Sequence, residues 1–215
     1  MKYQGIIFDL DGVICSTDRY HYQAWKKMAD GIGVYFDEVI NNRLRGVSRM
    51  DSLEIILERS REQYTDAQKA ALAEQKNNLY RELLMQMSPA GLSDEVKFAL
   101  DALRARGLKL AIGSSSKNAR LILGRIGLGD YFDAVSDGTN ITHSKPHPEV
   151  FLKAAEMLGL APGRCLVVED ARAGVDAAMA GGFDSAGLGE AAEYERVTYG
   201  LSAFGCLLNV AGAAV

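Results

Sequence analysis

The most constraining feature of the 215-residue sequence is an alternation of short apolar runs with stretches of helical spacing. Each run is rich in β-forming residues, and the segments that follow repeat apolar residues every three or four positions. The predicted strands are Tyr3–Phe8, Leu108–Gly113, Asp133–Ser136, Arg164–Glu169 and Phe183–Leu188. Such alternation predicts an α/β fold: a doubly wound parallel sheet of the Rossmann-like type, with helices on both faces.

One long segment interrupts this alternation. Helical spacing continues through it, with helix starts predicted near Thr17, Ser48 and Thr65, and no run in it predicts a strand. About seventy residues are too many for a loop between two strands. The predicted domains are therefore a helical cap, 16–87, and a core formed by 1–15 and 88–215. A cap inserted after the first strand is expected to lie over the carboxyl edge of the sheet and to close a site there.

The composition excludes several classes of protein. A net charge of −4 and an isoelectric point near 5.5 argue against nucleic acid as the main partner. No segment approaches the roughly 20 apolar residues of a membrane span, and no leader pattern precedes the first strand. Three widely spaced cysteines, Cys15, Cys165 and Cys206, form neither a disulfide framework nor a zinc pattern. We therefore expect a cytoplasmic protein that acts as a monomer on a small molecule.

The first predicted strand ends in two aspartates and a glycine, in the stretch IIFDLDGV. Asp9 and Asp11 are two residues apart, so their carboxylates repel each other and are costly to desolvate. A divalent cation, or a phosphate site with a lysine nearby, would neutralise them. The ordinary alternative is a strand-ending turn in which Asp9 caps a helix.

Polar residues also end the other predicted strands. Three serines at 114–116 follow the second strand, where hydroxyls and amides at a helix start can cradle a phosphate. Lys145 stands in SKPHPEVF, and Glu169 and Asp170 end a buried strand in VVEDARAG. Each has an ordinary alternative, as a helix cap or a surface lysine. Carboxyl ends of parallel strands meet at one edge, so we expect these side chains to lie close to Asp9.

These four segments, DLDGV, SSS, SKPHP and VVEDA, resemble the four motifs of the haloacid dehalogenase superfamily of phosphotransferases. The resemblance implies that Asp9 is the nucleophile and Asp11 the general acid and base. It implies that Ser114 and Lys145 hold the transferring phosphoryl group. The implied cofactor is Mg²⁺, with ligands Asp9, the backbone carbonyl of Asp11, Glu169 and Asp170. An ionised aspartate attacks phosphorus without a base, and Mg²⁺ prefers carboxylate oxygens.

Four stretches narrow the resemblance to the β-phosphoglucomutases of that superfamily: TDRYHYQAW, LRGVSRMDS, EQKNNLY and SSSKNA. Arg49 is implied to hold a second phosphate, opposite Asp9, because arginine grips phosphate with two parallel hydrogen bonds. A cation at a helix start is also unfavourable without a nearby anion. His21 is implied to pair with Lys76 and to help position Asp11. The other implied substrate contacts are Thr17, Trp25, Leu44, Gly46, Val47, Ser48, Ser52, Ser115, Ser116, Lys117 and Asn118.

Some of these positions have other interpretations. Trp25 is expected to pack in the core beneath the hinge rather than to contact sugar, and a single arginine such as Arg49 is often a solvated surface residue. Cys15 and Ser16 depart from the family pattern next to the hinge. Residues 190–215 align with no family pattern, so nothing is inferred for them.

The resemblance predicts a mutase that interconverts β-D-glucose 1-phosphate and β-D-glucose 6-phosphate through a phospho-aspartate and the 1,6-bisphosphate. The alternative in the same superfamily is a sugar or polyol phosphate phosphatase. A third interpretation, a phospho-accepting receiver domain, shares the parallel sheet, the Mg²⁺ and the phosphorylated aspartate. The DxDG stretch and the large predicted cap argue against it.

Overall fold

A computed structural model describes residues 2–44 and 47–212, and the chain divides into two compact units. The core unit consists of Met1–Ser16 and Ser88–Val215, and the helical unit of Thr17–Met87. Within the described residues, no helix is both long and apolar enough to cross a membrane.

The core unit is built on one sheet. Its strands are β1 (Gly5–Phe8), β2 (Lys109–Gly113), β3 (Ala134–Ser136), β4 (Cys165–Glu169), β5 (Asp184–Gly187) and β6 (Tyr199–Gly200). All neighbours pair in parallel, in the order β3-β2-β1-β4-β5-β6. The predicted parallel sheet is confirmed, and each of the five predicted strands is present within a few residues of its expected bounds.

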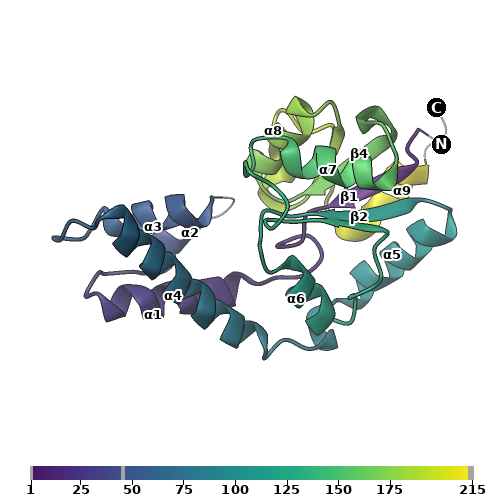
Figure 1. Ribbon diagram of the computed structural model, residues 1–215. Helices are drawn as coiled ribbons and strands as arrows, with labels where there is room; N and C mark the ends of the chain where they lie inside the picture. Colours follow the sequence, from purple (N-terminus) through teal and green to yellow (C-terminus); the bar gives the residue numbers. More distant parts are fainter. Residues whose placement is uncertain (1, 45–46, 213–215) are drawn as a thin grey trace. The chain divides into compact units, whose positions relative to one another are not determined.

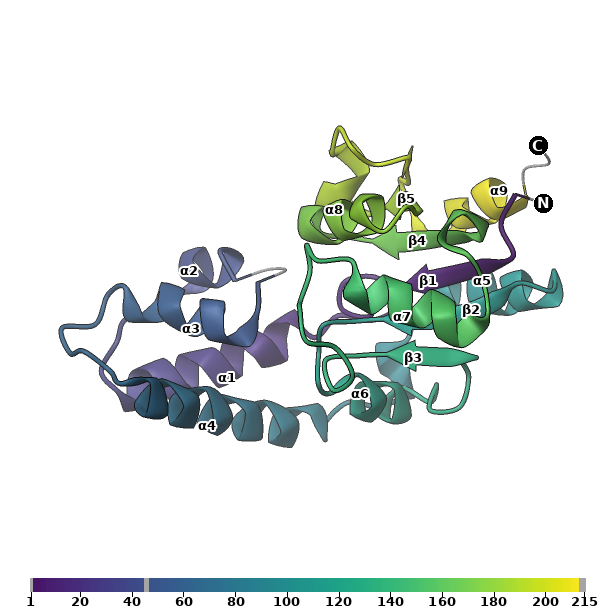
Figure 2. The ribbon, with the colours of Figure 1, turned by 45° about the horizontal axis from the view of Figure 1, so that its top comes forward.

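Helices cover both faces of this sheet. The core helices are α5 (Asp94–Ala105), α6 (Ala119–Arg125), α7 (Glu149–Leu158), α8 (Arg172–Ala180) and α9 (Leu207–Gly212), with single turns η1 (Pro89–Gly91), η2 (Pro162–Arg164), η3 (Gly189–Glu193) and η4 (Phe204–Cys206). In Figure 1, α7 and α8 lie on one face and α5 on the other. Figure 2 shows α7 lying across the central strands. The predicted doubly wound arrangement is thus present.

Alternate residues of the central strands supply two hydrophobic layers. Ile7 and Val167 are buried in one cluster with Phe151 of α7. Phe8 points to the opposite face, where its ring stacks on Phe204 of η4 at 5.9 Å between centroids. Strands that are buried on both faces have continuous apolar sequences, which is why these strands could be predicted from the sequence.

The sheet order positions the residues that follow the central strands. β1 lies between β2 and β4, and Phe8, its last residue, is level with Ile112 and Val168. The chain therefore leaves these three strands at adjacent points of the carboxyl edge. Asp9 and Asp170 come directly after β1 and β4.

The helical unit contains α1 (Asp18–Gly31), α2 (Glu38–Asn42), α3 (Arg49–Leu57) and α4 (Asp66–Leu84). As predicted, Ser48 caps α3, since its hydroxyl accepts from the Asp51 N–H. Thr65 and Gln68 form a full capping box at the start of α4. α1 and α3 both pack against α4, as Figure 2 also shows. The packed interior includes Trp25, Met28, Phe36, Leu53 and Ile56, all buried.

Candidate active site

Three carboxylates and one ammonium meet at the carboxyl edge of the core sheet. Lys145, in the loop between β3 and α7, donates to Asp9 Oδ1 at 2.5 Å and also to Glu169 Oε1. The other Glu169 oxygen accepts from the backbone N–H groups of Asp170 and Ala171, at 3.0 Å each. Ligand oxygens of Asp9, Glu169 and Asp170 lie within 4.8 Å of one another. Three segments far apart in the sequence thus form one cluster.

Burial makes it costly to keep the carboxylates of this cluster ionised. It is the main cause that raises the pKa of Asp9 well above its usual range, and neighbouring carboxylates add to the effect against the opposing charge of Lys145. Burial and repulsion by Glu169 raise the pKa of Asp170 to about 7. Burial alone would lower the pKa of Lys145, but the two carboxylates that it contacts outweigh this and raise it. The ammonium is therefore charged at neutral pH.

The donor set fits a divalent cation of the Mg²⁺ type. With all groups ionised, the three carboxylates outnumber the single ammonium, which leaves two negative charges in a buried place. Such a deficit is offset by one doubly charged ion, and oxygen donors within 4.8 Å of one another suit Mg²⁺. The raised pKa values of Asp9 and Asp170 come first from burial and then from repulsion by neighbouring carboxylates, and a bound cation would oppose both effects.

Two glycines make room for the carboxylates. Gly12 has φ of +81°, and a Cβ there would overlap the Asp170 carboxylate. Gly174, in the first turn of α8, lies so close to Glu169 that a Cβ would overlap that carboxylate. Glycine is therefore needed at both positions to keep the cluster in its present shape.

The serine loop after β2 differs from expectation. The helix that follows begins at Ala119 and not at the serines, because local turns use their hydroxyls: Ser114 Oγ accepts from the Ser116 N–H at 3.2 Å. Ser116 Oγ likewise accepts from the N–H of Asn118, the buried residue that precedes α6. The side-chain oxygen of Ser115 is buried and has no hydrogen-bond partner among the described residues. The helix start expected at the serines is thus wrong, whereas a phosphate-binding role for this loop, with its buried Ser115 hydroxyl, stays a prediction.

A buried lysine and a histidine meet in the helical unit. Lys76 of α4 lies 2.9 Å from Nδ1 of His21 on α1, and its ammonium faces the rings of Trp25 and Tyr80 at 4.7 and 4.5 Å. An ammonium only donates, so His21 Nδ1 accepts and the ring proton sits on Nε2. Burial, with the charges of Lys76 and Arg49, lowers the pKa of His21 well below its ordinary value. The predicted pairing of His21 with Lys76 is present.

Arg49 is the first residue of α3 and is held by α4. Its Nη2 donates to Asn77 Oδ1 at 2.9 Å, and its Nη1 lies 3.9 Å from Glu74 Oε2. Glu74 is therefore an anion near this helix start within the protein itself. Since Asn77 follows Lys76 in the sequence, one turn of α4 positions two cationic side chains.

The remaining predicted contacts fall into two groups. Trp25, Leu44 and Ser52 are buried in the helical unit. Trp25 belongs to the packed interior of that unit, in agreement with its expected role in core packing. Thr17 is also buried. The accessible or partly accessible ones are Val47, Ser48 and Lys117. Gly46 lies outside the described residues.

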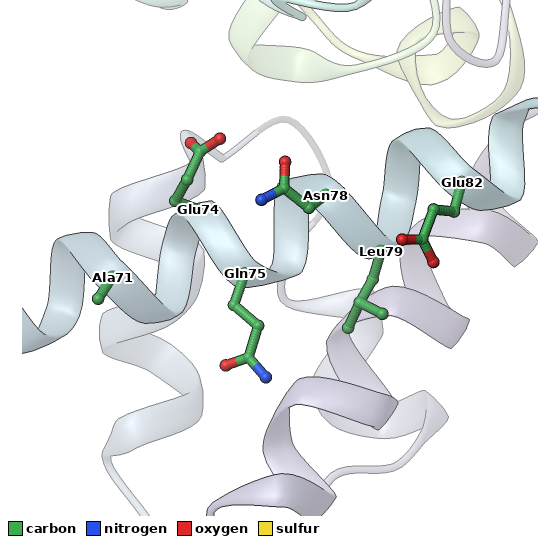
Figure 3. A pocket seen from close by; sticks show the side chains of 6 residues that line it. All are labelled: Ala71, Glu74, Gln75, Asn78, Leu79 and Glu82. Atoms are coloured by element: carbon green, nitrogen blue, oxygen red, sulfur yellow. The ribbon is translucent and has the colours of Figure 1, made fainter.

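A surface hollow on α4 is lined by none of the cations described above, although one of its lining residues, Glu74, pairs with Arg49. Figure 3 shows its lining residues: Ala71, Glu74, Gln75, Asn78, Leu79 and Glu82. These described lining residues include two carboxylates and no basic side chain. An acidic hollow repels phosphate, so it is not a candidate for the substrate site.

Sequence reasoning missed several residues that support these groups. Asn77 holds Arg49, the tilted ring of Tyr80 packs on His21 with centroids 4.1 Å apart, and Gly174 accommodates Glu169. Asn77 and Tyr80 stood within the quoted stretch EQKNNLY, so their position beside Lys76 was a usable signal. Nothing local in the sequence marks Gly174, because its role depends on a side chain in another element.

The state of His21 gives a direct prediction. Its depressed pKa means that the folded imidazole resists protonation as the pH falls below about 6.5, where an ordinary histidine takes up a proton. The unfolded chain then binds the extra proton, so unfolding becomes easier as pH falls through about 6.5, by up to about 1.4 kcal/mol per pH unit. Imidazole ¹⁵N spectra should show a neutral ring with the proton on Nε2, assigned by its absence in His21→Gln. A ring that titrates near 6.5 would contradict this.

Comparison with known proteins identifies the family. The sequence model of the haloacid dehalogenase-like hydrolases matches residues 3–182. The chain belongs to this family. Its motif-bearing segments are those that the structure brings together at Asp9, Lys145 and Glu169.

Relatives within the haloacid dehalogenase-like hydrolases include both mutases and phosphatases. The chain is 40% identical over 189 residues to a β-phosphoglucomutase of Bacillus subtilis strain 168, covering 87% of this chain and 84% of that protein. It is 34% identical over 185 residues to the fructose-1-phosphate phosphatase YqaB of Escherichia coli strain K12, covering 86% and 95%. A crystal structure of β-phosphoglucomutase from Clostridium difficile matches with a TM-score of 0.88 at 35% identity, covering 95% and 93%.

Proposed function

We propose that this protein is a Mg²⁺-dependent mutase that interconverts β-D-glucose 1-phosphate and β-D-glucose 6-phosphate through a phospho-aspartate and the 1,6-bisphosphate. The observation that favours a mutase over a phosphatase is a pair of cationic side chains on the helical unit, Lys76 and Arg49. Lys76 is buried beside a neutral histidine, and Arg49 is tied to the next residue of the same helix. A mutase needs a site that holds the phosphate that is not reacting, and these cations supply its charge.

Asp9 is proposed to attack phosphorus. Lys145 binds its Oδ1, so the ammonium lies where it can neutralise charge on the transferring group. Asp9, Glu169 and Asp170, with the carbonyl of Asp11, would hold Mg²⁺, which supplies further positive charge to that group.

The other core residues complete the proposed reaction. Asp11, two residues from the nucleophile, exchanges a proton with the sugar hydroxyl as general acid and base. The hydroxyl of Ser114 and the buried Ser115 hydroxyl donate to the phosphoryl oxygens. The predicted distal contacts Ser116, Lys117 and Asn118 remain part of this proposal. The segment Thr17–Met87 is proposed as a cap over the site.

A phosphatase is the second candidate, favoured by the 34% identity to a fructose-1-phosphate phosphatase. The difference lies in the acceptor: a phosphatase passes the phosphoryl group of Asp9 to water, and a mutase passes it to a sugar hydroxyl. The same carboxylate and lysine cluster serves both reactions, so the core alone does not separate them.

The deciding experiment follows both products at once. The protein is incubated with Mg²⁺, β-D-glucose 1-phosphate and a trace of the 1,6-bisphosphate, and phosphorus NMR records each species. Glucose 6-phosphate that appears in step with loss of the 1-phosphate supports the mutase. Inorganic phosphate without glucose 6-phosphate would make the protein a phosphatase.

Arg49→Ala tests the second phosphate site. We expect conversion to glucose 6-phosphate to fall about a hundredfold, because removing a partly buried cation from a phosphate that it binds costs about 2–4 kcal/mol. Hydrolysis of a monophosphate by the core should change much less. Arg59→Ala is the matched control, since Arg59 is exposed and its guanidinium lies over Tyr35. Equal losses of both activities, or equal effects of both variants, would refute the second site.

Mg²⁺ should stabilise the core unit, and more so at high pH. The pKa of Asp170 is raised to about 7, so between about pH 4 and 7 the folded metal-free protein binds more protons than the unfolded chain. Its free energy of unfolding therefore falls as pH rises through this range. At pH 8, Mg²⁺ at 100 times its Kd should raise the unfolding temperature by about 5–10 °C. At pH 5.5 protons compete, and the shift should be smaller. Equal shifts at both pH values would contradict the assignment.

A further inference from the structure

The loop that carries Lys145 also carries two of the three histidines of the chain. His143 and His147 flank the lysine at equal distance in sequence, and Glu149 begins α7 directly after them. One ligand atom from each of His143, His147 and Glu149 lies within 4.8 Å of the others. The roles of Asp9 and Lys145 use none of these three side chains.

Hydrogen bonds from backbone N–H groups orient the Glu149 carboxylate. Its oxygens accept from the N–H of Thr142, at 3.0 and 3.1 Å, and from the N–H of His143, at 2.8 Å. Lys153 pairs with Oε1 at 3.0 Å. Hydrogen bonds of this kind orient a ligand carboxylate before a metal binds. The carboxylate is thus preorganised although the loop is at the surface.

Both imidazoles contact Glu149, His143 through the carboxylate and His147 through the backbone. His143 Nδ1 lies 3.2 Å from Glu149 Oε2, and the rings of His143 and His147 contact each other at a tilt of 35°, with centroids 4.6 Å apart. His147 Nδ1 accepts a long hydrogen bond, 3.3 Å, from the Glu149 N–H. The ring contact and this bond hold His147 beside the other two donors.

The separation of the ligand atoms and their chemical type indicate which metal ions would bind to His143, His147 and Glu149. In a tetrahedral zinc site, bonds of about 2.0–2.2 Å place neighbouring ligand atoms about 3.3 Å apart. The His143–Glu149 separation of 3.2 Å already has this value. Two nitrogens and one oxygen suit Zn²⁺, Cu²⁺ or Ni²⁺, whereas Mg²⁺ prefers oxygen alone. The His143 side chain is 63% exposed, so water can fill the fourth position.

We propose that His143, His147 and Glu149 form a second metal site, for a borderline transition-metal ion such as Zn²⁺, distinct from the three-carboxylate cluster. An ion bound there would link His143, which precedes Lys145, to His147 and Glu149, which follow it. The segment that carries Lys145 would thereby be held at both ends. The Lys153 ammonium opposes a cation, so removing that charge should strengthen binding. The proposal does not depend on which reaction the protein catalyses.

Calorimetry with untagged protein and Zn²⁺, in excess Mg²⁺ to occupy the carboxylate cluster, tests the site. One equivalent of Zn²⁺ should bind, and His147→Ala and Glu149→Gln should each weaken binding at least about tenfold. Lys153→Met should tighten it several-fold. Glu156→Gln, on an exposed position of the same helix, is the matched control and should leave the affinity unchanged.

Spectroscopy identifies the ligands directly. Cu²⁺ bound at this site should show electron paramagnetic couplings to two imidazole nitrogens, which the carboxylate cluster does not contain. His143→Ala should remove one coupling, and unchanged unfolding temperatures of the metal-free variants would show that the fold is intact. Absence of Zn²⁺ binding, affinities insensitive to both histidines, or a signal from oxygen ligands alone would each overturn the proposal.

Discussion

Asp9→Asn should lower phosphoryl transfer by about 10⁴-fold for every sugar phosphate tested, since it removes the proposed nucleophile. Asparagine has the same shape as aspartate but carries no charge, and its amide is a poor nucleophile. Incubation with the 1,6-bisphosphate should phosphorylate the wild-type chain, detectable by trapping the acyl phosphate with hydroxylamine, and should leave the variant unmodified.

The same substitution should not unfold the protein. Burial and repulsion raise the pKa of Asp9, so the ionised carboxylate costs stability when no metal is bound. Without Mg²⁺ at pH 8, the variant should therefore unfold at an equal or higher temperature than wild type. Asp130→Asn, at an exposed aspartate of the core unit, is the control for activity. Turnover by Asp9→Asn near the wild-type rate would end the phospho-aspartate mechanism.

The sheet was predictable because its central strands are buried on both faces. Ile6, Ile7 and Phe8 are fully buried, so their sequence is a continuous apolar run with a clear end. The strand β6 gave no such signal, because Tyr199–Gly200 is only two residues long and pairs at the edge. Tertiary pairing, not local pattern, creates that strand.

The cluster at the strand ends was predictable from topology alone. Parallel strands bring the residues that follow them to one edge, so the order of the predicted strands was enough to expect Asp9 beside Asp170. The start of α6 was predicted too early. Serine is a common helix cap, but the Ser114 N–H bonds to the Ser136 carbonyl at 3.1 Å and its hydroxyl serves a local turn. A contact with another strand thus overrides the local preference.

Gly174 shows why part of the site could not be predicted from the sequence. It lies in the first turn of α8, where alanine is ordinarily the better residue by about 1 kcal/mol. Here a Cβ would overlap the Glu169 carboxylate, which is buried and held by Lys145 and two backbone N–H groups. The carboxylate cannot swing aside without breaking these bonds, so the usual preference for alanine is reversed.

Gly174→Ala is therefore expected to lower the free energy of unfolding by about 3–5 kcal/mol, the cost of disrupting a buried ion pair. Activity should fall about a hundredfold or more, and the Mg²⁺-dependent rise in unfolding temperature should shrink. Gly124→Ala is the matched control, because Gly124 also lies in a helix and a Cβ there meets no atom among the described residues within 4 Å. That variant should be neutral, or up to about 1 kcal/mol more stable. Equal stabilities of the two variants would show that Glu169 is not fixed in the way the structure depicts.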